Sequence, residues 1–391
     1  MDWKTLESRV REVASYLWDA PARSATVNGV NVDCVIEHSS DYWVLVEISK
    51  ESTLDKLRTD LGKFATVRPY LFSKSIYPKC IFVCQSAPPP SLVTSGKGSN
   101  VDVVSFAQFE AMFFDYPRYH FVRSDRPFGS AVDPFSGIKD SSQYVPVQYK
   151  GLTDNRLYSI GEIANLVAND NRVVLLGNYG TGKSRCIQEL FHLMRPRAEA
   201  RHIYPLSIDL RHNWGVRRGS EIIRRHFDDL GLSKDADNLI KVLAKGRVPL
   251  LIDGFDEIGS QAWSDDPTLI KNIRMQSLSG VRDLIGTTTA GVIVTGREHY
   301  FDSHTEMFAC LGLNPEKTVL IECHEEFSDE EVAEYLKALS ISLTIPDWIP
   351  KRPLVCQILR ARDNLTWPFF GFSGLDGVVP VAVEGVPFEM D

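Results

Sequence analysis

Apolar residues recur at helical spacing over the first twenty residues of the chain. Four of them lie three or four positions apart and give one apolar face: Leu6, Val10, Val13 and Leu17. A second helical stripe begins at Leu54, directly after Ser52 and Thr53, which are both suitable N-cap residues. Strand-like runs lie at four places: residues 26–38, 42–49, 80–84 and 101–105. Residues 1–120 are therefore predicted to form a small α/β domain, with an exposed loop over residues 85–100.

The pattern changes in the middle of the chain. Residues 121–150 are rich in Pro, Gly, Ser and Asp and have few periodic apolar positions, which predicts a linker. From about residue 158 helical and strand-like patterns alternate, as they do in βαβ units around a parallel sheet. A second α/β domain, with a parallel sheet, is therefore predicted over residues 151–325.

A glycine-rich segment follows the strand-like run at residues 173–176 and has the G-x-x-x-x-G-K-[ST] pattern of a phosphate-binding loop. Its residues are Gly177, Asn178, Tyr179, Gly180, Thr181, Gly182, Lys183 and Ser184, and Arg185 follows as part of the same segment. The glycines allow backbone N–H groups to point at phosphate oxygens, and the helix expected to begin near Lys183 directs the positive end of its dipole there. Lys183 is expected to contact the β and γ phosphates, and the Ser184 hydroxyl to bind Mg²⁺.

An acidic segment follows a second buried strand-like run, at residues 248–252. Asp253 ends this run and is expected to hold Mg²⁺, on a strand that neighbours the one before the phosphate-binding loop. Glu257, with Asp256 as the second choice, is expected to orient and deprotonate the attacking water. A third strand-like run leads to Arg297, a cation that would sense the γ-phosphate. These residues together predict a site for ATP or ADP with Mg²⁺, and ATP hydrolysis.

With these motifs in place, the chain resembles the NACHT family of STAND NTPases, the nucleotide-dependent switches of innate immunity and programmed cell death. The segments that carry the resemblance are residues 253–257 (DGFDE), 203–211 (IYPLSIDLR), 295–297 (TGR), 326–336 (EFSDEEVAEYL) and 352–354 (RPL). The resemblance implies a P-loop NTPase domain over residues 151–325, the start of a helical arm over residues 326–365, and a contact of Pro353 with adenine. Residues 366–391 are rich in Gly and Pro and are unlike the family's usual continuation, so an atypical tail is expected there.

The beginning of this arm also has a helix signal of its own. Ser328 and Glu331 match a capping box. The apolar residues that follow lie on one helical face: Val332, Tyr335, Leu336 and Leu339. A helix is therefore predicted from about residue 329.

The order of the predicted elements in the first domain resembles the PD-(D/E)xK restriction-endonuclease fold. The resemblance implies that Asp33 and Glu47, on adjacent strands, hold a Mg²⁺ ion that activates water for phosphodiester cleavage. Two residues after the second acid, where this pattern has a lysine, the chain has a serine. Lys50 is one position further and points to the other face of a regular strand unless a bulge turns it, so Lys56 or Lys63 from the next helix is the alternative. The domain is expected to be either an active nuclease or an inactive relative that binds without cutting.

Composition and charge narrow the classes of protein. Hydrophobic residues make up 43% and charged residues 24% of the 391 residues, an ordinary globular mixture that excludes a collagen, a coiled-coil rod or a wholly disordered chain. The net charge of −8 excludes a generally basic nucleic-acid-binding surface, so any DNA or RNA would need a local groove. The seven cysteines include no pair of CxxC motifs, and no stretch has the roughly 18 apolar residues of a membrane span. A reduced, cytoplasmic protein without membrane contact is expected.

The predicted function is an ATP-binding and ATP-hydrolysing signalling switch with an N-terminal, Mg²⁺-dependent, nuclease-like effector. A prokaryotic, anti-phage role is implied by the resemblance alone. The expected partners are further copies of the chain in a nucleotide-dependent oligomer, DNA or RNA, and an unidentified trigger or sensor. Two alternatives stay open: a non-enzymatic adaptor whose first domain only recruits a partner, and a restriction-linked AAA+ motor.

Overall fold

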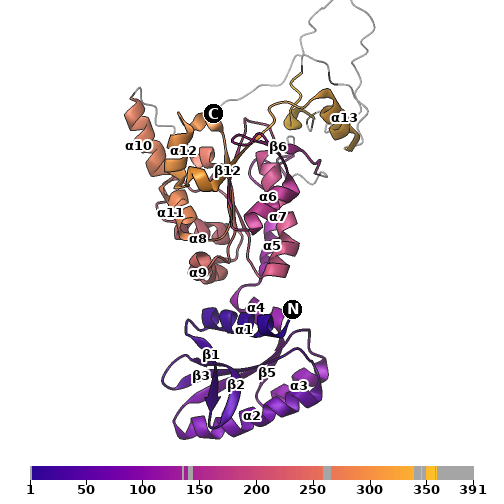
Figure 1. Cartoon of the computed structure of the whole chain (residues 1–391), viewed down its shortest axis with the longest axis vertical. Helices are drawn as coiled ribbons and strands as arrows, with labels where there is room; N and C mark the ends of the chain where they lie inside the picture. Colours follow the sequence, from indigo (N-terminus) through magenta and orange to yellow (C-terminus); the bar gives the residue numbers. More distant parts are fainter. Residues whose placement is uncertain are drawn as a thin grey trace, which may run out of the picture.

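The computed structural model describes residues 2–133, 136–139, 144–258, 266–338, 345, 349–356 and 358. It contains two sheets, each covered by helices and arranged end to end along the long axis of the molecule (Figure 1). The tail expected over residues 366–391 lies outside the described residues. Within the part of the chain that is described, none of the helices combines the length and the apolar character that a membrane crossing requires.

The N-terminal domain is built around the five-stranded sheet. Its strands are β1 (Ala22–Val27), β2 (Val30–Glu37), β3 (Tyr42–Ser49), β4 (Tyr77–Cys84) and β5 (Asp102–Ser105). Its helices are α1 (Trp3–Leu17), α2 (Leu54–Ser73), α3 (Pro90–Gly98) and α4 (Phe106–Phe113). The strands lie in chain order, antiparallel from β1 to β3 and parallel from β3 to β5. Helices α1 and α4 cover one face of this sheet, and α2 and α3 cover the other (Figure 1).

Strand β3 explains why the domain has two apolar layers. Successive side chains of a strand point to opposite faces of the sheet. Val44 and Ile48 pack in the cluster that includes α1, whereas Leu45 packs with the apolar face of α2. Glu47 follows Leu45 by two positions and therefore faces α2.

Two local features of this domain differ from the sequence-based expectation. Residues 26–38 were expected to form one strand, but they contain the end of β1, a tight turn and β2. The turn is formed by Asn28 (φ 50°) and Gly29 (φ 75°). The segment expected as an exposed loop over residues 85–100 contains α3, which has Pro90 at its first helical position. The Ser, Gly and Pro content of this segment is typical of a loop, but it is equally compatible with a short helix started by a proline.

The second domain is built around the seven-stranded sheet. Its strands are β6 (Gln148–Gly151), β7 (Leu157–Ser159), β8 (Arg172–Leu176), β9 (Leu206–Asp209), β10 (Leu250–Asp253), β11 (Val292–Gly296) and β12 (Thr318–Cys323). The helices that accompany it are α5 (Tyr116–Ser124), α6 (Ile160–Ala168), α7 (Lys183–Arg201), α8 (Gly219–Asp229), α9 (Ser233–Val242), α10 (Pro267–Ser277), α11 (Ser279–Thr287) and α12 (His304–Leu311). Short 3₁₀ helices lie at Leu243–Lys245, Phe255–Ile258, Glu298–Tyr300 and Pro315–Lys317.

The strand order of the second sheet is β7-β6-β12-β8-β11-β10-β9. From β12 to β9 the strands are parallel, whereas β6 and β7 form an antiparallel edge. Strand β8, which precedes the glycine-rich loop, is central. The expectation that Asp253 stands on the neighbouring strand was wrong, because β11 lies between β8 and β10. Parallel strands joined through helices need not be neighbours, and sequence order alone does not reveal the insertion.

The segment between the two sheets packs against the second domain. In α5, the Tyr119 hydroxyl accepts a hydrogen bond from the backbone N–H of Ser207 (3.1 Å) and lies 2.9 Å from Nε2 of His226. Further along, Phe128 is fully buried. The chain therefore leaves the N-terminal domain between α4 and α5, earlier than the expected boundary at residue 120, and residues 126–132 cover the second domain where an open linker was expected.

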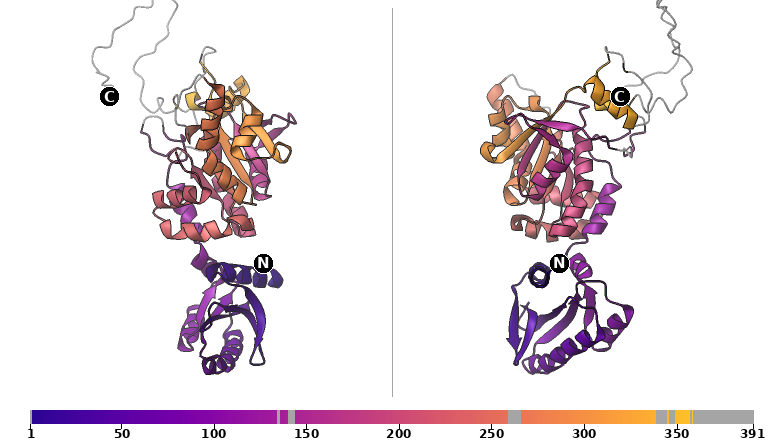
Figure 2. Two further views of the ribbon diagram at one scale, coloured as in Figure 1. Left: turned by 90° about the vertical axis from the view of Figure 1, so that its left-hand side faces the viewer. Right: turned by 45° about the vertical axis from the view of Figure 1, so that its right-hand side comes forward.

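A polar cluster joins the two domains. Arg247 of the second domain forms a bidentate ion pair with Glu12 of α1, at 2.8 Å for both contacts. Glu110 of α4 accepts hydrogen bonds from Arg9 and from the Tyr204 hydroxyl, each at 3.0 Å. Figure 2 shows the face of the N-terminal domain that carries α1 turned toward the second domain. This interface lies away from the glycine-rich loop, which is at the other end of the second sheet.

The arm begins with α13 (Asp329–Ala338), as its sequence predicts. The capping box is present: the Ser328 N–H donates to Glu331 Oε2 (2.8 Å), and the Glu331 N–H donates to Ser328 Oγ (3.2 Å). Val332 and Leu336 are buried in a small apolar cluster with Phe327. The predicted apolar face is therefore confirmed for these positions, while Leu339 lies outside the described residues.

Candidate nucleotide-binding site

The loop between β8 and α7 is curled by two glycines in the left-handed region. Gly180 has φ 79° and Gly182 has φ 91°, conformations that other residues rarely adopt. Gly182 is the N-cap of α7 and makes no side-chain capping hydrogen bond. The first N–H groups of an α-helix have no partner within the helix, so this end of α7 is suited to bind an anion.

The polar residues of the loop stabilise its curl. Lys183 Nζ donates to the carbonyl oxygens of Gly177 (2.7 Å) and Asn178 (3.0 Å), and burial lowers the pKa of this lysine. Thr181 Oγ1 donates to the Asn178 carbonyl at 2.8 Å, and the Asn178 side chain donates to Glu325. The Lys183 ammonium group is thus bound to two carbonyl oxygens of the loop. A phosphate oxygen would take their place as its hydrogen-bond acceptor.

Tyr179 and Arg185 are two further residues of the predicted segment. Tyr179 is exposed at the rim of the pocket. Arg185 donates to Gln188 Oε1 at 2.7 Å, on its own helix. Both line the same pocket as Lys183.

Asp253 is the most buried acid of the site, with 5% of its surface exposed. Thr295 Oγ1 donates to its Oδ1 at 2.6 Å. Burial raises the pKa of Asp253, whereas hydrogen bonds from Ser184 and Thr295 oppose that rise. Ser184 and Asp253 therefore meet across the intervening strand β11, although they are 69 positions apart in the sequence numbering.

The other two acids of the segment have different partners. Asp256 forms an ion pair with the Arg297 side chain (Nε–Oδ2, 2.7 Å) and accepts a hydrogen bond from the Arg297 backbone N–H (3.2 Å). Glu257 lies 3.5 Å from Arg211 Nε. Burial, and then the charge of Asp253, raise the pKa of Glu257 to about 7. Glu257 is thus able to take up a proton near neutral pH, which favours it over Asp256 as a base.

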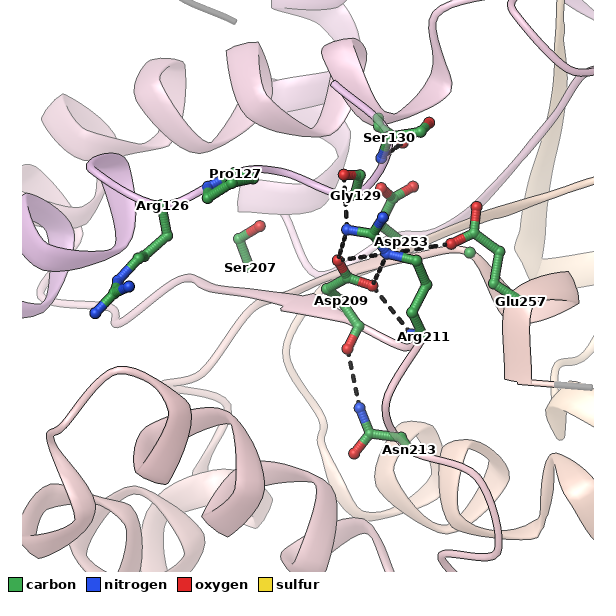
Figure 3. A network of polar contacts seen from close by, with 12 residues as sticks. Arg126, Pro127, Gly129, Ser130, Ser207, Asp209, Arg211, Asn213, Asp253 and Glu257 are labelled. Atoms are coloured by element: carbon green, nitrogen blue, oxygen red, sulfur yellow. Dashed lines mark hydrogen bonds and ion pairs between the residues drawn. The ribbon is translucent and has the colours of Figure 1, made fainter. Parts of the chain in front are cut away.

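Arg211 and residues 129–130 are site residues that the motifs did not predict. Arg211, after the end of β9, forms an ion pair with Asp209 (2.6 Å) and donates to the Gly129 carbonyl at 2.7 Å. The Ser130 backbone N–H lies 3.3 Å from Ser184 Oγ and donates to it. Figure 3 shows Arg211 between Asp209, Glu257 and Gly129. Of these residues, only Arg211 had a signal in the sequence, as the last residue of the segment 203–211.

The arm contributes to the same pocket. Its lining combines the loop, the acids and apolar residues from two other segments: Ala131, Tyr144, Val145, Val147, Tyr149, Tyr335, Pro353 and Leu354. The Leu354 N–H donates to the Gly180 carbonyl at 3.2 Å. A Cβ added to Gly182 would lie 3.9 Å from Pro353 Cγ, so Pro353 lies beside the loop. Its contact with adenine stays a prediction.

The second domain has the fold of a P-loop NTPase. This assignment rests on the glycine-rich loop between the central strand β8 and α7, and on Asp253 at the end of β10. No protein-family model and no curated protein sequence matches the chain.

Solved structures similar to this chain have low identity. Orc1 of Aeropyrum pernix in complex with DNA is 11% identical with a TM-score of 0.33, and the match covers 53% of this chain and 58% of that one. Domain III of the replication initiation protein DnaA from Thermotoga maritima is 12% identical with a TM-score of 0.30, over 53% of this chain and 82% of that one. PCH-2 of C. elegans is 16% identical with a TM-score of 0.26, over 49% and 48%. The matched region thus spans little more than half of the Orc1 chain.

The two acids predicted for the N-terminal domain lie close together. The register of β2 and β3 pairs Cys34 with Val46, which puts Asp33 opposite Glu47 on the same face. Asp33 Oδ2 accepts the Ile48 N–H at 3.0 Å. Glu47 is fully buried, and burial raises its pKa above the usual value, with the charge of Asp33 as a smaller contribution.

Lys63, and not Lys50, contacts Glu47. Lys50 is exposed at the bend after β3. Lys63 of α2 forms an ion pair with Glu47 and another with the buried Asp60 (3.1 Å). The Glu47 atom Oε1 is buried and has no hydrogen-bond partner. Among the described residues, no group of three or more His, Cys, Asp or Glu side chains is placed to hold a metal ion.

Proposed function

We propose that the chain binds ATP with Mg²⁺ in the second domain and hydrolyses it. The observation that carries this proposal is the convergence of Lys183 and Ser184 from the glycine-rich segment with Asp253 and Glu257 from the acidic segment on one pocket. Lys183 would bind the β and γ phosphates as a point charge, and the N-terminal end of α7 would bind phosphate oxygens through its backbone N–H groups.

The residues present suit a magnesium ion. Ser184 Oγ and the Asp253 carboxylate are oxygen ligands, which Mg²⁺ prefers, and Asp253 is a buried acid whose charge needs a cation. Thr295 holds Asp253 from the far side by its 2.6 Å hydrogen bond, which fixes the orientation of the carboxylate. Mg²⁺ supplies charge neutralisation at the phosphates when it is bound.

Glu257 is the residue proposed to activate water. Its carboxylate lines the pocket, and Arg211 holds it at 3.5 Å without neutralising it by a close bidentate contact. Arg297 would contact the γ-phosphate after leaving Asp256, since a cation there stabilises charge on the transferred group. The two acids therefore have separate roles: Asp256 holds the arginine and Glu257 faces the water.

ATP hydrolysis by the full chain tests this proposal. We expect hydrolysis that requires Mg²⁺ and falls to background in Lys183→Ala, while Lys241→Ala, an exposed lysine on α9, keeps the wild-type rate. Equal rates in Lys183→Ala and the wild type would overturn the proposal.

We propose further that the nucleotide controls a signalling switch, as in the NACHT proteins that the sequence resembles, with a role in defence against phage. The hydrogen bond between Leu354 and Gly180 supports this, because a change in the loop reaches the arm directly. ATP is expected to shift the chain to a larger species in solution than ADP does, and Lys183→Ala is expected to abolish that shift. Phage protection of a bacterial host by the wild type but not by Lys183→Ala would support the defence role, and equal protection would oppose it.

A nuclease-like effector in the N-terminal domain is the second proposed function. It is supported by Asp33 opposite Glu47 and by the unpartnered, buried Oε1 of Glu47. Lys63 would take the position of the lysine that the restriction-endonuclease pattern has on the strand. Cleavage of DNA or RNA with Mg²⁺ and ATP is expected to disappear in Asp33→Ala and Glu47→Ala and to persist in Lys50→Ala. If the folded wild-type protein cuts neither DNA nor RNA, the nuclease proposal is overturned. The N-terminal domain would then be a non-enzymatic adaptor that only recruits a partner.

A further inference from the structure

Residues 127–131 cover the position where the two expected magnesium ligands meet. These residues follow α5 and cross the carboxyl end of the second sheet. Ser130 Oγ lies 3.1 Å from Ser184 Oγ, in addition to the 3.3 Å hydrogen bond from the Ser130 N–H. The hydroxyl that would bind the metal is therefore engaged by this segment.

Gly129 shows how close this contact is. It has φ 50°, and a Cβ added to it would lie 1.9 Å from Asp253 Oδ2 and 2.6 Å from Ser184 Oγ. Magnesium binds its ligands at about 2.0–2.1 Å in octahedral geometry and keeps several waters. The Gly129 backbone leaves no space for such a coordination sphere between these two side chains.

Two arginines hold the segment in place. Arg211 donates to the Gly129 carbonyl at 2.7 Å. Arg123 of α5 is buried; it donates to the Pro127 carbonyl at 2.9 Å and lies over the ring of Phe128, 3.7 Å from the centroid. Figure 3 shows Gly129 and Ser130 beside Asp253 and Arg211. The segment is thus held at Pro127, Phe128 and Gly129.

We propose that residues 127–131 are a built-in competitor of Mg²⁺ at Ser184 and Asp253, so that binding of Mg²⁺ with the nucleotide displaces them. This inference rests on the proposed ATP site and adds its regulation. The nucleotide alone is not expected to require the displacement, because Gly129 and Ser130 contact the two expected metal ligands, whereas Lys183 donates to the carbonyl groups of Gly177 and Asn178. Binding of Mg²⁺ to Ser184 and Asp253 does require the displacement of residues 127–131.

The displacement would be transmitted toward the N-terminal domain. Arg123 bonds to Pro127 and, through Nε, to the Ser207 carbonyl of the strand segment β9 at 2.9 Å. It stands on α5, which follows α4 of the N-terminal domain after two residues. Movement of residues 127–131 therefore removes a contact of the helix that connects the two domains, which links the state of the metal site to the effector.

Magnesium titration of the full chain tests the competition. With a non-hydrolysable ATP analogue present, the Mg²⁺ concentration for half-maximal binding is expected to fall about fivefold in Gly129→Ala, because the added Cβ clashes with Asp253 and pushes the segment away. It is expected to fall about threefold in Ser130→Ala, which loses about one hydrogen bond. Binding of the analogue in EDTA is expected to be unchanged. The control is Gly161→Ala on α6, where a Cβ meets open space.

The outcomes separate the two proposals. Absence of analogue binding by the wild type would overturn the proposed nucleotide site itself. Binding with the same Mg²⁺ requirement in Ser130→Ala, Gly129→Ala and wild type, or a higher requirement in the variants, would overturn only the competition. Hydrogen exchange of the wild type gives a readout that needs no variant. The amides of residues 128–131 are expected to exchange faster with Mg²⁺ and analogue than with analogue alone, and equal or slower exchange would contradict the inference.

Discussion

The two acidic clusters of this chain are built in opposite ways. In the second domain, Asp253 and Glu257 line a pocket, and among the described residues Glu257 has a single cation partner, Arg211, at 3.5 Å. In the N-terminal domain, Glu47 is fully buried between the sheet and α2 and is in direct contact with Lys63. The acids of the second domain can be reached by a ligand because they line a pocket. Glu47 is enclosed by the core of the N-terminal domain and is part of its packing. The difference predicts that mutations in the first cluster change activity, and that mutations in the second change stability as well.

The largest effect is expected for Glu257→Gln. It removes the proposed base but keeps the size and the polar surface of the side chain, so ATP hydrolysis is expected to fall by about 100-fold or more, with nucleotide binding retained. The midpoint of thermal unfolding should stay close to the wild-type value. Hydrolysis at the wild-type rate in this variant would assign the base to Asp256 or to another group.

Lys63→Ala examines the second cluster. It leaves the buried Glu47 without its cation, and a cost of about 2 kcal/mol in the free energy of unfolding is expected, less than for a fully buried pair because Lys63 is partly exposed. Urea unfolding measures it. Lys50→Ala, at an exposed position, serves as the control and is expected to change stability by less than about 0.5 kcal/mol. Equal stabilities of the two variants would mean that the ion pair contributes nothing.

Stability is also expected to depend on pH through His226. Burial, and then the charge of Arg123, lower the pKa of His226 to about 3, while the unfolded chain has an ordinary histidine. The unfolded state therefore takes up a proton below about pH 6.5 that the folded state excludes, so stability is full above that pH and about 2 kcal/mol lower at pH 5.

The matched variant for this prediction is His226→Gln, which can still accept a hydrogen bond from the Tyr119 hydroxyl. Its unfolding free energy is expected to fall less between pH 7.5 and pH 5 than that of the wild type. The same loss in both proteins would assign the acid sensitivity to other groups.

Hydrolysis is expected to depend on pH through Glu257. Its pKa of about 7 means that the base is protonated in acid, so the rate should rise about tenfold per pH unit below 7 and level off above it. Rates measured from pH 5.5 to 8.5 at saturating Mg²⁺ and ATP show this rise. A flat profile would separate Glu257 from the chemical step.

The smallest effect is expected in the arm. Ser328→Ala removes the N-cap of α13 and costs about 1 kcal/mol of local stability. Hydrogen exchange over residues 329–338 is expected to speed up by about fivefold. Glu334→Ala, on the exposed side of α13, is expected to leave the exchange unchanged, and equal effects of both changes would show that the capping box is not formed in solution.

The same contrast explains what the sequence could predict. The glycine-rich loop is one continuous motif whose glycines, lysine and serine are positioned by the strand before it and the helix after it, so local sequence contains the geometry. Asp253 was predicted at the end of its strand, but that strand was wrongly expected to be next to β8, because the insertion of β11 between β8 and β10 is a property of the whole sheet.

Contacts between distant segments were not predictable in this way. The sequence left Lys50, Lys56 and Lys63 open as the cation beside Glu47, and only the structure shows that Lys63 reaches Glu47 from α2. Gly129 and Ser130 lie in a stretch whose composition indicates a linker, and nothing in that composition shows that Phe128 is buried or that Ser130 meets Ser184. A contact between side chains of distant helices, strands or loops can be identified only from the tertiary structure.

Calorimetric titration of ATP into the purified full chain with Mg²⁺ tests the central claim most directly. The account predicts saturable binding of one nucleotide per chain that is lost in Lys183→Ala. A wild-type protein that is folded and releases no heat with ATP or ADP, at any Mg²⁺ concentration, would contradict it.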